Sequence, residues 1–312
     1  MMMNKIKSKF LSLFKSMAVY QKKLSEAWFG RRLTIKTIIN KILNKIINKI
    51  KKILNRFGSK KKCYICNRTF NYFTKYRNGT KGIPEFHKRL NGVGSDIDNF
   101  GCMYCGSHDR ERHLYMFFDA LKLWKKMKNA KILHFAPEIN LPTKIMEQSP
   151  LEYFKADLYP QTKDVKKIDA TKLPFSDETF DFIISNHILE HIPDYNKALC
   201  EFYRVIKPGG IQILQTPYSK LLKNNFEDKN IDTDELRLFF YGQKDHVRIF
   251  GEYQFLKSIE DVGFNLQIKK HKDFFDDHMA FVYGVNKKED LILVVKPTDN
   301  SILSTYGEDD SK

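Results

Sequence analysis

The segment from Phe180 to Gly210 constrains the fold most, because it predicts a buried strand, a helix and a second strand in succession. Residues 182–184 form an apolar run that is too short for a helix and is typical of a strand in a parallel sheet. After Asp194 the apolar residues recur at helical spacing, and the Lys-Pro-Gly-Gly sequence at 207–210 is expected to end that helix with a left-handed glycine cap. The next strand is expected over residues 211–214. This pattern predicts an α/β fold.

Polar side chains follow the first of these strands, at Asn186, His187, Glu190 and His191. Ligands of open α/β sheets bind at the carboxyl ends of the strands, so we expect a functional site here. Residues 187–191 also fit the H-x-x-E-H motif of inverted zinc proteases. That chemistry requires both histidines on one sustained helix, and a proline follows two residues later, so the protease interpretation is disfavoured.

Five short motifs occur in order along the chain, namely LHFAPE at 133–138, LPF at 173–175, HILEHIPD at 187–194, KPGG at 207–210 and GQKDHVR at 242–248. With these motifs the chain resembles the class I S-adenosylmethionine (SAM)-dependent methyltransferases, and especially a bacterial branch of them, from about Cys63 to about Pro297. The resemblance implies a Rossmann-like seven-stranded α/β sheet. Its last elements are expected as a helix over 252–262 and strands over 266–270 and 291–296.

The resemblance implies SAM as cofactor, bound after a first strand at 131–135. Most SAM enzymes have glycine in the turn that follows, whereas this chain has no glycine between Gly106 and Gly209, and Ala136 is the small residue there. Asp157, at the end of the second strand, is placed to bind the ribose hydroxyls. Asp169 is placed to bind the adenine amino group. The predicted cofactor-binding residues are Ala136, Glu138, Asp157, Asp169, Ala170, Asn186 and His187.

Methyl transfer to a hydroxyl needs a base, and histidine is the natural one near neutral pH. We predict His246 as that base, oriented by Asp245, with His187 as the alternative base. Arg248 is predicted to hold an anionic group of the acceptor. An equally open alternative is that residues 245–248 only cap the helix that starts near Glu252. The segment 218–244 is expected to form the acceptor side or a lid, with further substrate candidates at Glu227, Asp228 and Arg237.

Four cysteines occur as two C-x-x-C turns, Cys63/Cys66 and Cys102/Cys105, and predict a structural zinc site. Disulfides are the alternative, disfavoured in a chain without an export signal. The long separation between the turns implies an inserted subdomain. After the second turn, Arg112 and its neighbours precede a helix expected over 114–127 and are interpreted as structural rather than anion-binding. The remaining Cys200 is expected in the core.

The N-terminal 62 residues contain 18 Lys and Arg residues and one acidic residue, so this segment accounts for the whole formal net charge of +17. Isoleucine and leucine recur every three to four positions from Leu33 to Phe57, with lysines between them and Gly58 after them; a weaker stripe runs from Ile6 to Trp28. A basic amphipathic helix suits an anionic membrane surface. Packing on the protein itself, self-association and RNA contact are the alternatives.

These observations predict four regions: a basic amphipathic arm at 1–62, a zinc module with its connecting helix at 63–128, the methyltransferase domain at 129–300 and a polar tail at 301–312. The expected function is O-methylation of a saccharide or other small-molecule acceptor near the membrane. The alternatives are an rRNA methyltransferase and a non-catalytic SAM-binding module; a nucleic-acid partner is disfavoured because residues 63–127 are not notably basic. We expect a cytoplasmic protein, peripheral at the inner membrane surface.

Overall fold

The computed structural model describes residues 32–298, which form two compact units that divide after Phe57. The first unit is the helix α2 (Arg32–Asn55). Its apolar stripe is exposed, with side chains 43–52% accessible at Ile38, Ile42, Ile46, Ile53 and Leu54. Within the described residues no helix is long and apolar enough to cross a membrane. The predicted stripe from Ile6 to Trp28 and the polar tail lie outside the described residues.

The second unit is built on a seven-stranded sheet with the order β11-β12-β8-β7-β4-β5-β6. Five strands, from β8 to β6 in that order, run parallel, and β12 is antiparallel to both of its neighbours. The strands span Lys131–Phe135 (β4), Glu152–Asp157 (β5), Lys166–Lys167 (β6), Phe180–Ser185 (β7), Ile206–Ile213 (β8), Asn265–Lys269 (β11) and Leu291–Val295 (β12). The predicted Rossmann-like α/β sheet is confirmed.

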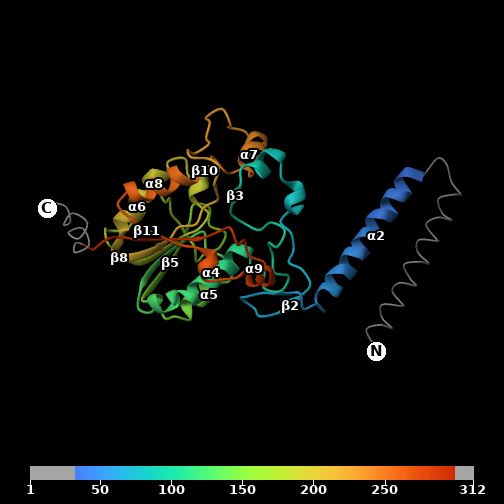
Figure 1. Cartoon of the computed structure of the whole chain (residues 1–312), viewed down its shortest axis with the longest axis horizontal. Helices are drawn as coiled ribbons and strands as arrows, with labels where there is room; N and C mark the ends of the chain where they lie inside the picture. The colour runs from blue at the N-terminus through green and yellow to red at the C-terminus, as the bar shows by residue number, and fades with distance from the viewer. Residues whose placement is uncertain (1–31, 299–312) are drawn as a thin grey trace, which may run out of the picture. The chain divides into compact units, whose positions relative to one another are not determined.

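Helices cover both faces of this sheet, as Figure 1 shows for α6 and α8 on one side and α4 and α5 on the other. Alternate residues of each strand face opposite layers, so Leu133 packs with α6 and α8 whereas Ile132 packs with α4 and α5. The helices are α4 (Asp109–Ala120), α5 (Leu141–Met146), α6 (Tyr195–Val205), α8 (Glu252–Asp261) and α9 (Asp277–Tyr283), with 3-10 turns η2 (Leu123–Met127), η3 (Leu189–His191) and η4 (His271–Asp273). Two apolar cores therefore enclose the sheet.

The helix α6 begins where the sequence predicts. The side chain of Asp194 caps it by accepting a hydrogen bond from the backbone N–H of Lys197 at 3.0 Å. Its inner face buries Ala198, Leu199 and Phe202 completely, and each large apolar side chain buried in this way stabilises the fold by about 1.5–3 kcal/mol. The helix thus fixes the position of the loop that precedes it.

Three predictions about local structure are wrong. The helix expected over 114–127 is broken after Ala120, because Lys122 adopts a left-handed conformation. Residues 207–210 do not cap α6, which already ends at Val205; they lie in β8, where Gly209 has a φ of +76° and its N–H donates to Lys296. Cys200 is exposed rather than in the core, because it lies outside the helical face that buries Ala198 and Leu199.

Small elements connect the cysteine region to the segment predicted as a lid. The cysteine region contains β1 (Lys61–Lys62), β2 (Thr69–Phe70), η1 (Gly79–Gly82), α3 (Glu85–Arg89) and β3 (Gly92–Val93). The lid segment contributes β9 (Tyr218–Ser219), α7 (Asp234–Tyr241) and β10 (Phe250–Gly251). Strand β9 pairs with both β3 and β10, and the His87 ring is 2.9 Å from the carbonyl oxygen of Phe239. The inserted subdomain therefore packs on the lid segment.

Candidate functional site

The chain leaves two neighbouring parallel strands in the left-handed conformation. Ala136, just after β4, has a φ of +43°, and His187, just after β7, has a φ of +54°. Neither residue is glycine, and such a conformation costs about 1–3 kcal/mol where it persists, usually at a functional site. Hydrogen bonds hold both turns: the N–H of Ala136 donates to Ala156 at 2.8 Å and that of His187 to Gln215 at 2.6 Å. The predicted role of Ala136 thus coincides with a constrained turn.

A buried hydrogen-bonded cluster lies between these two turns. His134 Nε2 is 2.8 Å from Glu138 Oε2, and His134 Nδ1 is 2.8 Å from the Tyr153 hydroxyl. Asn186 Nδ2 donates to Glu138 Oε1 at 3.0 Å, while the buried Asn186 Oδ1 has no hydrogen-bond partner in the described part of the chain. Burial would raise the pKa of Glu138, but the His134 ring and the Asn186 amide outweigh it and lower that pKa. Glu138 is thus a fixed carboxylate, and Asn186 retains a free acceptor.

The two predicted nucleoside-binding acids lie on neighbouring loops at the same edge. Asp157 ends β5 and accepts the Tyr159 N–H through Oδ1 at 2.7 Å. Asp169 accepts from the N–H and the hydroxyl of Thr171, also through Oδ1, at 2.8 Å each. Neither Oδ2 atom has a hydrogen-bond partner among residues 32–298. Each acid therefore holds its own turn with one oxygen and leaves the other for a ligand.

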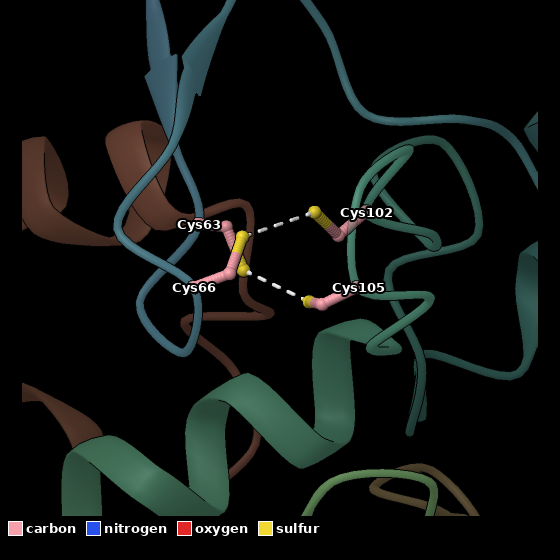
Figure 2. Close-up of side chains that lie close together, drawn as sticks. All are labelled: Cys63, Cys66, Cys102 and Cys105. Atoms are coloured by element: carbon pink, nitrogen blue, oxygen red, sulfur yellow. Dashed lines mark hydrogen bonds between the residues drawn. The ribbon is translucent and has the colours of Figure 1, made fainter.

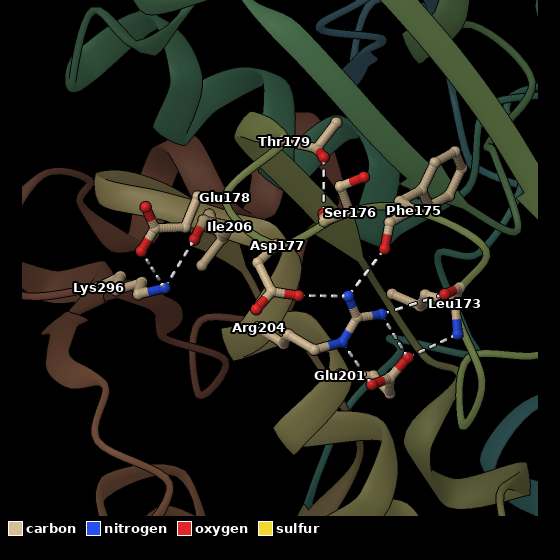
Figure 3. Close-up of polar contacts among 10 residues, drawn as sticks. All are labelled: Leu173, Phe175, Ser176, Asp177, Glu178, Thr179, Glu201, Arg204, Ile206 and Lys296. Carbon is tan, nitrogen blue, oxygen red and sulfur yellow. Dashed lines mark hydrogen bonds and ion pairs between the residues drawn. The ribbon is translucent and has the colours of Figure 1, made fainter.

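The loop after Asp169 is predicted to flank adenine, and residues of α6 hold it in place. Figure 3 shows the Arg204 guanidinium between the Phe175 carbonyl, at 2.7 Å, and the Leu173 carbonyl, at 3.1 Å. Glu201 accepts the Leu173 N–H at 2.6 Å and also binds Arg204. Ala170 and Leu173 are buried, and the Phe175 ring packs on Phe180 with centroids 4.8 Å apart. The loop thus presents a fixed apolar wall.

These residues fit SAM in the chemistry of their donors and acceptors. Two free carboxylate oxygens suit ribose hydroxyls and an adenine amino group, and the unpartnered amide oxygen of Asn186 suits an ammonium or N–H group. The Ala136 turn leaves only a methyl group at the strand exit. When bound, SAM would supply an electrophilic sulfonium methyl group.

A second buried cluster continues along the same edge toward β8 and β12. His187 Nδ1 is 3.4 Å from Glu190 Oε1 and its Nε2 is 3.7 Å from Glu289 Oε1. The other oxygen of Glu289 is 3.7 Å from His113 of α4. Burial and Arg110 would lower the pKa of His187, but the two carboxylates raise it above its usual value. The two carboxylates thus stabilise the charged form of His187, and its role as the alternative base stays a prediction.

The carboxylate of Glu190 is the centre of this cluster. It is buried, and its Oε2 accepts a hydrogen bond from the Thr216 hydroxyl at 2.8 Å. Burial would raise the pKa of Glu190, but the hydrogen bond from His187 and the nearby imidazoles of His191 and His246 lower it to about 2. Glu190 is therefore ionised at neutral pH and sets a negative potential at this edge.

His246, the predicted base, lies beside Glu190 and is buried, with its Nε2 unpartnered within the described residues. Burial lowers its pKa to about 4 despite the nearby Glu190 carboxylate, so the imidazole is neutral at physiological pH. The prediction that Asp245 orients His246 is wrong. Asp245 is 69% exposed, and its Oδ2 is 3.3 Å from His191 Nδ1 instead.

Arg248, predicted to hold an anionic group of the acceptor, binds mainly within the protein. Its guanidinium is buried and donates to the carbonyl oxygens of Leu189, Ile192 and Pro193. Its remaining Nε donates to Glu227 Oε2 at 2.6 Å. Arg248 therefore clamps the η3 turn with four of its five N–H groups, and a contact with an acceptor stays a prediction.

The other predicted substrate residues also bind within the protein. Glu227 is the partner of Arg248, and Asp228 Oδ1 accepts from the backbone and side chain of Asn230 at 2.8 and 2.9 Å. Arg237, half-buried in α7, donates through Nε to Ile231 at 3.4 Å. The three side chains hold the lid segment, and a direct contact with an acceptor stays a prediction.

The two C-x-x-C turns meet as predicted (Figure 2). Cys63 Sγ lies 3.6 Å from Cys105 Sγ, and Cys66 Sγ lies 3.8 Å from Cys102 Sγ. A tetrahedral zinc ion with bonds of about 2.3 Å would hold its sulfur atoms about 3.8 Å apart. The residue after each second cysteine is left-handed, with φ of +59° at Asn67 and +73° at Gly106, so each turn curls around the sulfur pair.

Ionised sulfur atoms this close together need a compensating cation. Burial raises the pKa of Cys66 to about 11, with the neighbouring cysteines adding to the rise. Four thiolates at this spacing would repel one another unless a metal ion bound them. The donor set therefore fits zinc.

Arg112 connects this cysteine cluster to the rest of the unit. The side chain is completely buried, and each of its five N–H groups donates to a backbone carbonyl. The acceptors are Phe100 and Ser107 through Nη1, Asn99 and Gly284 through Nη2, and Tyr283 through Nε, at 2.6–3.2 Å. The guanidinium also lies 3.8 Å from the centre of the Phe73 ring. The structural interpretation of Arg112 fits this geometry.

Comparison with known proteins bears on the part of the sheet that contains the cofactor residues. The family model described as "Methyltransferase domain" matches residues 143–214, from α5 to the end of β8. The chain contains a methyltransferase domain. Its strand order, with one antiparallel strand, agrees with the class I SAM-dependent fold that the sequence predicts.

Two curated relatives match a part of this chain. A demethylmenaquinone methyltransferase of Lysinibacillus sphaericus is 40% identical over 68 residues, or 22% of this chain and 29% of the relative. A ubiquinone/menaquinone biosynthesis C-methyltransferase of Desulfotalea psychrophila is 42% identical over 60 residues, or 19% of this chain and 24% of the relative. The chain thus spans less than a third of the length of either relative.

A solved structure is also similar. The S-adenosylmethionine-dependent methyltransferase of Mesorhizobium loti has 13% sequence identity and a TM-score of 0.41, covering 58% of this chain and 96% of that one.

Sequence reasoning missed two members of the candidate site, Glu289 and Gln215, and interpreted a third, His113, as structural along with its neighbour Arg112. Glu289 lies two residues before β12, so it reaches the site only because β12 runs antiparallel to its neighbours. A sequence signal existed, since an acid directly before the last apolar strand is placed at this edge once that strand is assigned as antiparallel. For Gln215 no local pattern was informative.

Proposed function

We propose that this protein transfers the methyl group of SAM to a hydroxyl of a polar acceptor, such as a saccharide or another small molecule. The match of residues 143–214 to a methyltransferase domain is the observation on which this proposal rests. The free carboxylate oxygens of Asp157 and Asp169 and the free amide oxygen of Asn186 support SAM as donor. The adjoining cluster of His187, Glu190 and His246 is the side on which we place the acceptor.

The chemistry of that cluster favours a hydroxyl acceptor. In-line displacement at a sulfonium methyl requires the acceptor oxygen in near-attack position and a group that takes its proton. His246 offers a buried neutral imidazole with an unpartnered nitrogen, which can take a proton. Thr216 and Glu190 offer further hydrogen-bonding groups for a polar molecule, whereas a bare hydrocarbon surface would leave these buried groups unpaired.

A second candidate is C-methylation of a quinone-type ring, because the two curated relatives are named as quinone-pathway methyltransferases. Their similarity covers only 22% and 19% of this chain, so their acceptor does not transfer with it. The polar cluster at Glu190 suits a flat apolar ring less well than a hydroxylated molecule.

The deciding experiment is transfer of radiolabelled methyl from SAM into fractionated lysate. Asp157→Ala serves as the blank because it removes a carboxylate expected to bind ribose. Label in polysaccharide or glycolipid supports the proposal, whereas label in quinone supports the second candidate. Label in RNA would indicate an rRNA methyltransferase. Retained SAM binding without transfer to any fraction would favour a non-catalytic SAM-binding module.

We further propose that Cys63, Cys66, Cys102 and Cys105 bind a structural zinc ion that holds the inserted subdomain against the methyltransferase domain. The four sulfur atoms converge, and the buried Arg112 beside them places a positive charge where a zinc tetrathiolate would be negative. Elemental analysis of protein purified without chelator should find zinc, and Cys66→Ser should contain one zinc ion per chain fewer than the wild type. Purified wild-type protein without zinc would contradict the proposal.

We also propose that the amphipathic arm binds an anionic membrane surface. The exposed isoleucine stripe of α2 and its surrounding lysines support this, since each Lys near such a surface contributes on the order of 1 kcal/mol. Liposomes that contain an anionic lipid should sediment the full chain but not a chain lacking residues 1–62. If the full chain and the shortened chain sedimented equally, residues 1–62 would not be the membrane-binding segment. If the full chain bound RNA and not liposomes, the nucleic-acid alternative would be favoured.

A further inference from the structure

Three side chains converge on one point beside the proposed acceptor side without a full set of partners. Glu190, His191 and His246 each offer a nitrogen or oxygen atom, and these three atoms all lie within 4.8 Å of one another. Glu190 and His246 are buried, and His191 is about one-third exposed. They come from η3 and from the loop before β10, which the backbone hydrogen bond from Val247 to Glu190 joins at 2.9 Å.

His191 and His246 each have a ring nitrogen without a hydrogen-bond partner in the described part of the chain, and Glu190 has an oxygen that His187 contacts. Glu190 binds Thr216 through Oε2, and its Oε1 lies 3.4 Å from His187 Nδ1 and 3.9 Å from His191 Nε2. His191 Nδ1 is 3.1 Å from the Asp245 carbonyl and 3.3 Å from its carboxylate, which places the ring proton on Nδ1 and the lone pair on Nε2. His246 Nε2 is buried, with no partner in the described part of the chain.

We propose that Glu190, His191 and His246 bind a divalent transition-metal ion, with Asp245 as the positioning residue for His191. Two imidazole nitrogens and one carboxylate oxygen form the ligand set of catalytic zinc sites and of non-haem iron(II) sites. A carboxylate that holds the far nitrogen of a ligating histidine is the usual outer partner of such sites. This site is distinct from the four-cysteine cluster, whose sulfur ligands come from residues 63–105.

The geometry requires a small closure around the ion. Metal–ligand bonds of about 2.0–2.2 Å place tetrahedral nitrogen and oxygen ligands about 3.4 Å apart, compared with the 3.9 Å between His191 and Glu190. His191 is the ligand with room to move, because its side chain is 32% exposed, and the same exposure offers the ion an entry path. His187 Nδ1 also lies 3.4 Å from Glu190 Oε1, so the ion would share this oxygen with the His187 ring.

Three protein ligands leave coordination positions open for an oxygen of the acceptor. The ion would then hold an acceptor hydroxyl in place and increase its acidity. In this arrangement His246 is a ligand and not the base, and the proton of the metal-bound hydroxyl would pass to water. Only this role rests on the proposed methyl transfer, since the metal site itself is defined without it.

Cobalt(II) binding to the full-length protein that carries a single zinc ion per chain, at the four cysteines, tests the site when it is followed by visible absorption. We expect one cobalt ion with the weak bands of nitrogen and oxygen ligands, without the intense charge-transfer band of cobalt thiolates. His191→Ala should weaken binding at least tenfold, and Asp245→Asn should weaken it about tenfold to a hundredfold. His278→Ala, which removes an exposed histidine of α9, is the matched control and should bind as the wild type does.

The proposal is overturned if the zinc-loaded wild type binds no cobalt, or if His191→Ala and His278→Ala both retain wild-type affinity. Circular dichroism serves as the control for folding of each variant. We expect His191→Ala to fold, because the side chain is already about one-third exposed. The readout needs neither SAM nor an acceptor. Failure of methyl transfer would therefore refute the proposed function and leave the cobalt result unchanged.

Discussion

Replacing Arg112 by Met should nearly unfold the protein, although its guanidinium hydrogen-bonds to none of the proposed cofactor residues. The substitution retains an unbranched side chain but removes all five donors, and five backbone carbonyls then lose their partner. An orphaned buried acceptor costs about 1–3 kcal/mol, so even the lower value predicts a loss of about 5 kcal/mol. Since small proteins have a total stability of about 5–15 kcal/mol, this loss is a large part of it.

Urea denaturation followed by Trp fluorescence measures this loss, because Trp124 is buried between Tyr115 and Phe118. Arg110→Met is the matched control, since it removes the same charge from a half-buried position two residues away. We expect the control to unfold within about 1 kcal/mol of the wild type. If Arg112→Met unfolded at the same urea concentration as Arg110→Met and kept its metal, the five hydrogen bonds from Arg112 to backbone carbonyls would not contribute to stability as argued.

Three further substitutions test other contacts. Burial raises the pKa of Asp109 from 3.8 to about 6, so its contribution to stability is full below about pH 4 and about 3 kcal/mol is lost as the pH rises through 6. Urea denaturation at pH 4 and pH 7 should show this loss in the wild type and not in Asp109→Asn. The same pH dependence in both proteins would contradict the prediction. Glu201→Ala should weaken SAM binding about fivefold in calorimetry because it removes the acceptor of the Leu173 N–H, whereas Lys197→Ala, at an exposed position, should not. If both variants bound SAM equally well, the loop at Leu173 would not contribute to cofactor binding. Ala136→Gly should change the unfolding free energy by less than about 1 kcal/mol, because relief of the left-handed strain is offset by a more flexible unfolded chain. Ala136→Val should destabilise the protein by more than about 2 kcal/mol, and a well-tolerated valine would show that the turn is not constrained.

Features set by neighbouring residues could be predicted from the sequence. The strand at 131–135 has the predicted boundaries because a short apolar run between polar residues depends only on local pattern. The two C-x-x-C turns meet because each already presents a pair of sulfur atoms on a tight loop. The exposure of Cys200 was also within reach, because the helical period that buries Ala198 and Leu199 turns position 200 outward.

Features set by distant partners could not be predicted. Arg248 has the sequence context of an anion-binding residue, but carbonyls more than 50 residues away use its donors. Asp245 precedes His246 and yet faces His191, because the loop before β10 turns the two neighbours in different directions. Which of several polar groups meet depends on how the loops fold over the sheet edge, and no local pattern encodes that.

The direction of β12 has a consequence for the order in which the protein can mature on the ribosome. His113 and His187 emerge early, with α4 and β7, but Glu289, the carboxylate between them, is synthesised after most of the sheet. Because β12 enters the sheet against its neighbours, its docking brings Glu289 to the edge where the parallel strands end. Until that moment the nascent domain has two buried histidines without their shared counter-charge. A chain that ends before the last strand would therefore contain the proposed cofactor loops but lack Glu289, the carboxylate shared by His113 and His187.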